Sequence, residues 1–142
     1  MKVSQNFILE EFIDPETFKK WGDKSIYFLD KKIISIAQFI RDRFKLGVTI
    51  NNWHAGGNLQ HRGFRPPACT VGAALSQHRF GRALDCNVAG IFPRDLAKDI
   101  INNFDIYKKL GVTTIEDPEF TDTWTHTDCR WTDSEDLLIV KP

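Results

Sequence analysis

The chain has 142 residues, of which 42% are hydrophobic and 27% are charged, a balance that excludes an intrinsically disordered protein. Lysine plus arginine number 19, as do aspartate plus glutamate, so the chain lacks the basic excess of a general nucleic-acid-binding protein. We therefore expect a single domain over residues 1–142, with no nucleic-acid partner.

The N-terminal residues hold no apolar run of signal-peptide length, and no segment is long and apolar enough to cross a bilayer. We expect a chain made as a soluble cytoplasmic protein, without membrane insertion. The cysteines Cys69, Cys86 and Cys129 form no CxxC pair, which disfavours a zinc ribbon or a thioredoxin-type site. Free, partly buried thiols in a reducing compartment are expected instead.

Two helices are predicted in the N-terminal third. Asp14 followed by Pro15 is typical of a helix start, and Gly22 is typical of its end. A longer amphipathic helix is expected over residues 26–46, closed by Gly47. Its apolar residues recur at three- and four-residue steps and form one core-facing stripe, namely Leu29, Ile33, Ile36, Ala37, Ile40 and Phe44.

The next part of the chain alternates predicted strands with a long irregular segment. Residues 48–53 are expected to form a strand, and residues 82–88 a second one. The Gly-, Pro- and Arg-rich connection over 54–74 lacks a regular pattern, and connections of this length are usually functional.

A helix is expected to begin at Pro93 and to run towards Gly111. Its inward residues are predicted to be Leu96, Ala97, Ile100, Ile101 and Phe104. Strands are predicted over 112–116 and 123–131, joined by an acidic loop, with a last strand over 137–140. These elements predict an α+β fold, with a mainly antiparallel sheet and helices packed on one side.

Two segments carry side chains suited to a metal. His78 precedes the strand over 82–88, in which strict alternation places Asp85 on one face and the apolar Leu84 and Cys86 on the other. The same alternation in the segment over 123–131 places His126 on one face. If the two strands are neighbours, His78, Asp85 and His126 can meet at one point.

Two imidazoles and one carboxylate with an open position describe a catalytic zinc site, whereas a structural site usually has a fourth protein ligand. Taken singly, each histidine is more often a surface residue or a satisfied core residue than a ligand. A resemblance adds to the metal interpretation. The pattern Ser-x-His-x-x-Gly-x-Ala-x-Asp is filled at every position, by Ser76, His78, Gly81, Ala83 and Asp85.

Through this motif the sequence resembles the zinc D-alanyl-D-alanine carboxypeptidase and L-alanyl-D-glutamate endopeptidase family, over roughly residues 49–131. The resemblance implies the fold shared with the hedgehog signalling domain, and Zn²⁺ held by His78, Asp85 and His126. The sequence His126, Asp128 and Arg130 resembles the phage-type branch. Asp128 is expected to orient a histidine ligand.

A peptidase of this family uses an acidic residue a few positions before the last histidine as its base. Glu116, Glu119 and Asp122 are the candidates here, because Thr123 stands where the family commonly has Glu or Asp. Glu116 is preferred, since it ends a strand expected to pair with the His126 strand. Asp122 lies in the loop and is the alternative.

The family also has an arginine in a Gly-aromatic-Arg-Pro context, which Arg65 fits. Arg65 is expected to clamp a substrate carboxylate or to polarise the scissile carbonyl, with Arg62 as the second candidate and a structural loop arginine as the alternative. Ser76 is expected to be a turn residue. His54 and His61 are more often loop residues than ligands.

The resemblance implies hydrolysis of peptide bonds in bacterial peptidoglycan by metal-activated water. The phage-type pattern points to a phage lysis enzyme or a virion-associated enzyme that acts on the cell wall after release. The alternative is a non-catalytic zinc-binding structural or interaction module of the same fold. A metal-dependent nucleic-acid hydrolase is disfavoured, because the chain lacks a basic surface and a carboxylate-rich site.

Overall fold

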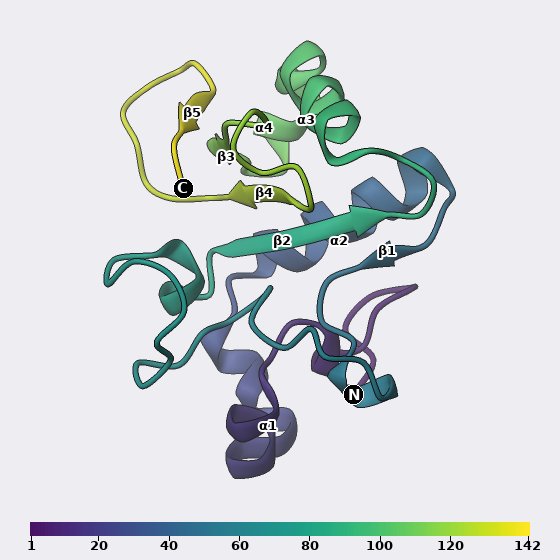
Figure 1. The fold of residues 1–142 in the computed structure, drawn as a ribbon, viewed down its shortest axis with the longest axis vertical. Coiled ribbons are helices and arrows are strands. Elements are labelled where there is room, and N and C mark those ends of the chain that lie inside the picture. The colour runs from purple at the N-terminus through teal and green to yellow at the C-terminus, as the bar shows by residue number, and fades with distance from the viewer.

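The computed structural model describes residues 1–142 as an α+β protein built around a five-stranded mixed sheet (Figure 1). The strand order is β1-β2-β4-β3-β5. The β1–β2, β2–β4 and β4–β3 pairs are antiparallel, as predicted for most of the sheet, whereas β5 pairs with β3 in parallel. The strands are β1 Val48–Thr49, β2 Ala83–Val88, β3 Thr114–Glu116, β4 Thr125–Asp128 and β5 Leu138–Val140.

The first predicted helix is confirmed. A short 3-10 helix, η1 (Leu9–Glu11), precedes α1 (Pro15–Trp21). The Asp14 carboxylate accepts hydrogen bonds from the first free backbone N–H groups of α1, which stabilises its start. Gly22 adopts a φ of 53° and ends the helix.

The long helix predicted over 26–46 is shorter than expected. Residues Gly22–Phe28 form a 3-10 helix, η2, and α2 spans Lys31–Phe44. The break occurs because Asp30 caps α2 by accepting a hydrogen bond from the backbone N–H of Lys32. Lys45 takes a left-handed conformation with a φ of 55° and ends α2 before Gly47 is reached.

The helical region after Pro93 consists of two helices, α3 (Pro93–Asn102) and α4 (Phe104–Lys109). The prediction that Ile101 faces inward is wrong, because its side chain is 39% exposed. The buried face of α3 is narrow, and a residue next to Ile100 lies about 100° further around the helix.

The core lies on the face of the sheet that carries Leu84, Cys86 and Val88 of β2. Helix α2 runs behind β2 in Figure 1, and both α2 and α3 contact that strand. Side chains from these helices close the core, among them Ile33, Ile36, Ala37, Ile40, Leu96, Ala97 and Ile100. The opposite face of β2, which carries Asp85, is left for the polar site.

The strand predicted over 48–53 is reduced to β1, and a 3-10 turn, η3 (Trp53–Ala55), follows it. The connection to β2 is otherwise irregular, as expected, except for a second 3-10 turn, η4 (Gln77–Phe80). All three cysteines are free, as predicted. None of the helices has the length and apolar character required to cross a membrane.

Candidate metal centre

Three side chains from three separate elements meet on the polar face of the sheet. His78 comes from η4, Asp85 from β2 and His126 from β4. Asp85 and His126 are directly paired in the β2–β4 register, so their side chains leave the sheet side by side. Asp85 Oδ1 lies 2.8 Å from His126 Nδ1 and 3.2 Å from His78 Nε2, and the two nitrogens are 3.3 Å apart.

Neighbouring groups fix how each imidazole is presented. His78 Nδ1 lies 2.7 Å from the carbonyl oxygen of Gly63 and donates to it, which leaves Nε2 with a free lone pair. His126 Nε2 lies 3.1 Å from Asp128 Oδ2 and donates to it, while Nδ1 donates to Asp85 Oδ1 at 2.8 Å. Loss of the Nδ1 proton would leave a lone pair on that nitrogen for a metal ion. Such partners are typical of histidines that bind metals, and Asp128 lies where the sequence predicted an orienting carboxylate.

The site is buried and strongly polar. Burial by itself would raise the pKa of Asp85, but the charge of His78 and hydrogen bonds from His126 and His78 hold this pKa well below its ordinary value. Burial by itself would lower the pKa of His126, but hydrogen bonds to Asp128 and Asp85 raise it to about 9. A carboxylate that stays ionised between two imidazoles is suited to a cation.

The donor atoms fit a tetrahedral metal ion. Four ligands at about 2.0–2.1 Å from zinc lie about 3.3 Å from one another. His78 Nε2 meets this spacing to both partners, at 3.2 and 3.3 Å. The 2.8 Å contact between Asp85 and His126 is a hydrogen bond, and it would open by about half an ångström around an ion. No fourth ligand of the His, Cys, Asp or Glu type joins this group.

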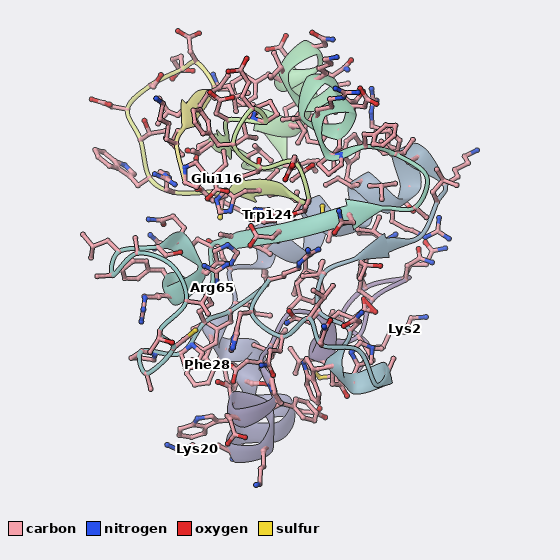
Figure 2. The ribbon with its side chains drawn as sticks, in the orientation of Figure 1. Lys2, Lys20, Phe28, Arg65, Glu116 and Trp124 are labelled. Carbon is pink, nitrogen blue, oxygen red and sulfur yellow. The ribbon has the colours of Figure 1, made fainter.

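Glu116 stands next to the three donors. It ends β3, and the β3–β4 register continues from Thr114–Asp128 to place Glu116 opposite His126. Glu116 Oε1 lies 3.8 Å from His126 Nδ1, while Oε2 accepts a hydrogen bond of 3.4 Å from Trp124 Nε1. Figure 2 shows Glu116 and Trp124 near each other on one side of β2, and Arg65 on the other side of that strand. The structure therefore places Glu116 beside the candidate metal ligands, on a strand end.

The other two acidic candidates lie elsewhere. Asp122 and Glu119 are exposed, and they line a separate hollow next to Phe92, Arg94 and Lys98. Neither lines the cavity that holds Asp85 and His126. In the sequence Glu116, Glu119 and Asp122 all stand close before His126. The strand register shows which of them lies near the candidate metal ligands, and it is Glu116.

Arg65 was expected to contact the substrate, but in the structure it binds a candidate metal ligand. Its Nη2 donates to Asp85 Oδ2 at 2.9 Å, and its Nε donates to the carbonyl oxygen of His61 at 2.6 Å. The guanidinium therefore holds the second oxygen of Asp85, while Oδ1 faces the histidines. Arg62, the second candidate, donates to Asn87 Oδ1 instead.

Asp85, His126 and Glu116 line a cavity of about 630 Å³. Most of the residues that line it are polar or charged, and they include the cations Arg65, Arg130 and Lys141. His61 belongs to this lining and His54 does not.

The Gly63 carbonyl and the Trp124 indole were not predicted as site groups. The alternating pattern around β4 could have indicated Trp124, because this residue is two positions before His126 and shares its face. The Gly63 carbonyl could not be predicted, because every residue has a backbone carbonyl.

No protein-family model, no curated protein and no solved structure matches this chain.

Proposed function

We propose that this protein is a zinc-dependent peptidase that cleaves peptide bonds in bacterial cell-wall peptide, with a fold of the hedgehog and D-alanyl-D-alanine peptidase type. One observation carries the proposal: three buried donor atoms converge, two of them from residues that line an open cavity, and a carboxylate stands beside them. Two histidines and one carboxylate with an open fourth position are the ligand set of a catalytic zinc.

The residues take distinct roles in this proposal. His78 Nε2, Asp85 Oδ1 and His126 Nδ1 would hold the ion, and their neighbours already orient them. Bound there, zinc supplies Lewis-acid activation of water and of a carbonyl group. Glu116 accepts a proton from the attacking water at Oε1 and returns it to the leaving amine.

Arg65 serves the same chemistry through two contacts. Its bond to Asp85 Oδ2 keeps that carboxylate turned towards the histidines. Its Nη1, which lies beside the backbone of Gly72, makes no hydrogen bond within the protein and would be the donor to a substrate oxygen, the role expected from the sequence.

The substrate class is supported by the ten-residue motif over 76–85 and by its resemblance to cell-wall peptidases. Lys141 in the cavity lining suits the carboxylates of such peptides, whereas Arg130 is already paired with Asp128. The phage-type arrangement of His126 and Asp128 supports a lysis or virion-associated context.

The test is direct. Zinc-loaded protein is incubated with purified peptidoglycan, and the released peptides are identified by mass spectrometry. We expect peptide release, about one zinc per chain, and loss of both in the His126→Ala variant. Bound zinc without any peptide release would support the alternative, a non-catalytic zinc-binding structural or interaction module. Full zinc content in His126→Ala would remove that residue from the ligand set.

A further inference from the structure

An irregular loop, residues 66–76, forms one wall of the cavity above the candidate metal centre. Val71, Gly72, Ala73 and Leu75 of this loop line the cavity. Val71 is 44% exposed and Leu75 is 78% exposed, although both are aliphatic. Exposed apolar side chains gathered at a cavity mark a surface that contacts a ligand.

The loop is held together by one side chain, Arg79. Its guanidinium donates to the carbonyl oxygens of Pro67 at 2.8 Å, Cys69 at 2.7 Å and Ala73 at 3.2 Å, with a longer contact of 3.5 Å to Pro66. Arg79 forms no ion pair with a carboxylate. A fork of five N–H donors can satisfy several carbonyls at once, which a lysine cannot do with the same geometry.

The position of Arg79 links this wall to the metal centre. It follows His78 in the 3-10 turn η4, and the two side chains point to different partners. His78 bonds to the Gly63 carbonyl and faces Asp85, while Arg79 reaches into the loop. The turn that presents a candidate ligand therefore also presents the anchor of the wall.

The wall also rests directly on Arg65. Gly72 has a φ of 79°, and a Cβ at this position would lie 2.5 Å from Arg65 Nη1. Arg65 is in turn fixed by Asp85 and the His61 carbonyl. The loop backbone thus approaches the site as closely as a glycine permits.

We infer that Arg79 is a positioning residue that holds residues 66–76 as an apolar wall, and that Val71 and Leu75 of this wall contact an aliphatic side chain of the substrate beside the scissile bond. The substrate part of this inference rests on the proposed peptidase function. In this arrangement the polar residues of the site, such as Glu116 and His126, carry out the reaction. The apolar wall selects which substrate side chain can bind beside the scissile bond.

The experiment compares Arg79→Met with Arg82→Met, a matched control three residues on whose exposed side chain makes no hydrogen bond. The substrates are soluble muropeptides prepared from purified peptidoglycan by cleavage of the glycan strands. We expect Arg79→Met to raise KM about tenfold and to change kcat by less than about threefold, because binding is lost and the metal and base are kept. Hydrogen exchange of the amides in 68–76 should become faster, and zinc content should stay the same.

A second variant guards against misfolding. Leu75→Ser changes an exposed side chain, so it should fold normally, leave amide exchange unchanged and raise KM. Wild-type KM and exchange in Arg79→Met would overturn the positioning role, as would loss of zinc from that variant. Wild-type KM in Leu75→Ser would overturn the substrate contact. A wild-type protein that cleaves no muropeptide would reject the proposed function and the substrate contact together, whereas amide exchange would still decide whether Arg79 holds the wall.

Discussion

Glu116 and Asp122 are both acidic residues shortly before His126, but only Glu116 is held against the candidate metal ligands. The reason is strand register. Glu116 lies opposite His126 across the β3–β4 pair and also accepts a hydrogen bond from Trp124. Asp122 is exposed at another hollow. A base held on a strand end keeps its position better than one in a loop.

The first prediction is that Glu116→Gln abolishes most turnover. The change keeps size and removes the proton acceptor, so kcat should fall by a factor on the order of 10²–10⁴ while zinc stays bound. Peptide release and zinc content are both measured. Asp122→Asn is the control and should keep near-normal activity. Activity that survives in Glu116→Gln but is lost in Asp122→Asn would give the role to Asp122.

The second prediction concerns zinc affinity and pH. The pKa of His126 is raised to about 9, so a proton occupies the imidazole at neutral pH and competes with zinc for Nδ1. Zinc affinity should therefore increase with pH up to about 9 and fall steadily as the solution is acidified. Competition with a chromophoric chelator at several pH values measures this dependence.

Asp128→Asn provides the comparison for the pH series. It removes a negative charge whose hydrogen bond raises the pKa of His126, so the fall in affinity should move to lower pH. A zinc affinity that does not change with pH in the wild-type protein would argue against His126 as a ligand.

At the scale of elements, the tight turn between η4 and β2 depends on Gly81. Its φ is 64°, and a Cβ there would lie 1.8 Å from the backbone oxygen of Phe28. The neighbouring backbone is held in place, since the Asp30 N–H donates to the Gly81 carbonyl. The glycine of the ten-residue motif is therefore required by a close approach of two chain segments.

The third prediction follows from this contact. Gly81→Ala should destabilise the protein by more than about 2 kcal/mol, because both positive φ and the clash act against folding. Gly90→Ala is the matched control: Gly90 has a φ of 73° with nothing within 4 Å of the added Cβ. Because only the positive φ acts there, Gly90→Ala should cost about 1–2 kcal/mol, less than Gly81→Ala. Thermal unfolding measures both, and equal losses in the two variants would show that the contact with Phe28 is unimportant.

Period-two alternation predicted the faces on which Asp85 and His126 lie, but not that their strands are neighbours; the meeting of these residues with His78 was expected from the family resemblance, and the structure pairs β2 with β4. The helix break at Asp30 was missed because the apolar stripe continues across it, from Leu29 to Ile33. The parallel direction of β5 was also missed, since it depends on the path of residues 129–137, which carries no strong pattern.

The bonds from Arg79 to four carbonyls could not be predicted either. Every residue has a carbonyl, so the sequence does not mark which ones an arginine will reach. The hydrogen bond between Arg65 and Asp85 could not be predicted either, because the two residues are 20 positions apart and lie in different segments.

At the scale of the whole molecule, the packing of the core determines which thiols can react. Burial raises the pKa of Cys86 and of Cys129 to about 12, and both belong to the main core cluster. Cys69 lies in the loop over 66–76 and is partly exposed. Reactivity follows thiolate character and exposure.

The fourth prediction is that a disulfide exchange reagent such as Ellman's reagent modifies Cys69 alone in the native protein at pH 8. Cys86 and Cys129 should react only after denaturation. Mass spectrometry of digested, labelled protein assigns each site, and Cys69→Ser serves as the control that should leave no fast-reacting thiol. Rapid labelling of Cys86 in the folded protein would show that the core opens locally.

The pairing of Asp85 with His126 joins positions 41 residues apart in the chain. In an unfolded chain these donors do not meet, and a slip of one residue between β2 and β4 would turn one of them to the opposite face of the sheet. A zinc ion would therefore bind only to molecules whose strands have aligned correctly. By mass action, free zinc at about 100 times its dissociation constant would add about 2.7 kcal/mol to the free energy of unfolding. Metal supply would then control how long the protein survives, in addition to the proposed activity.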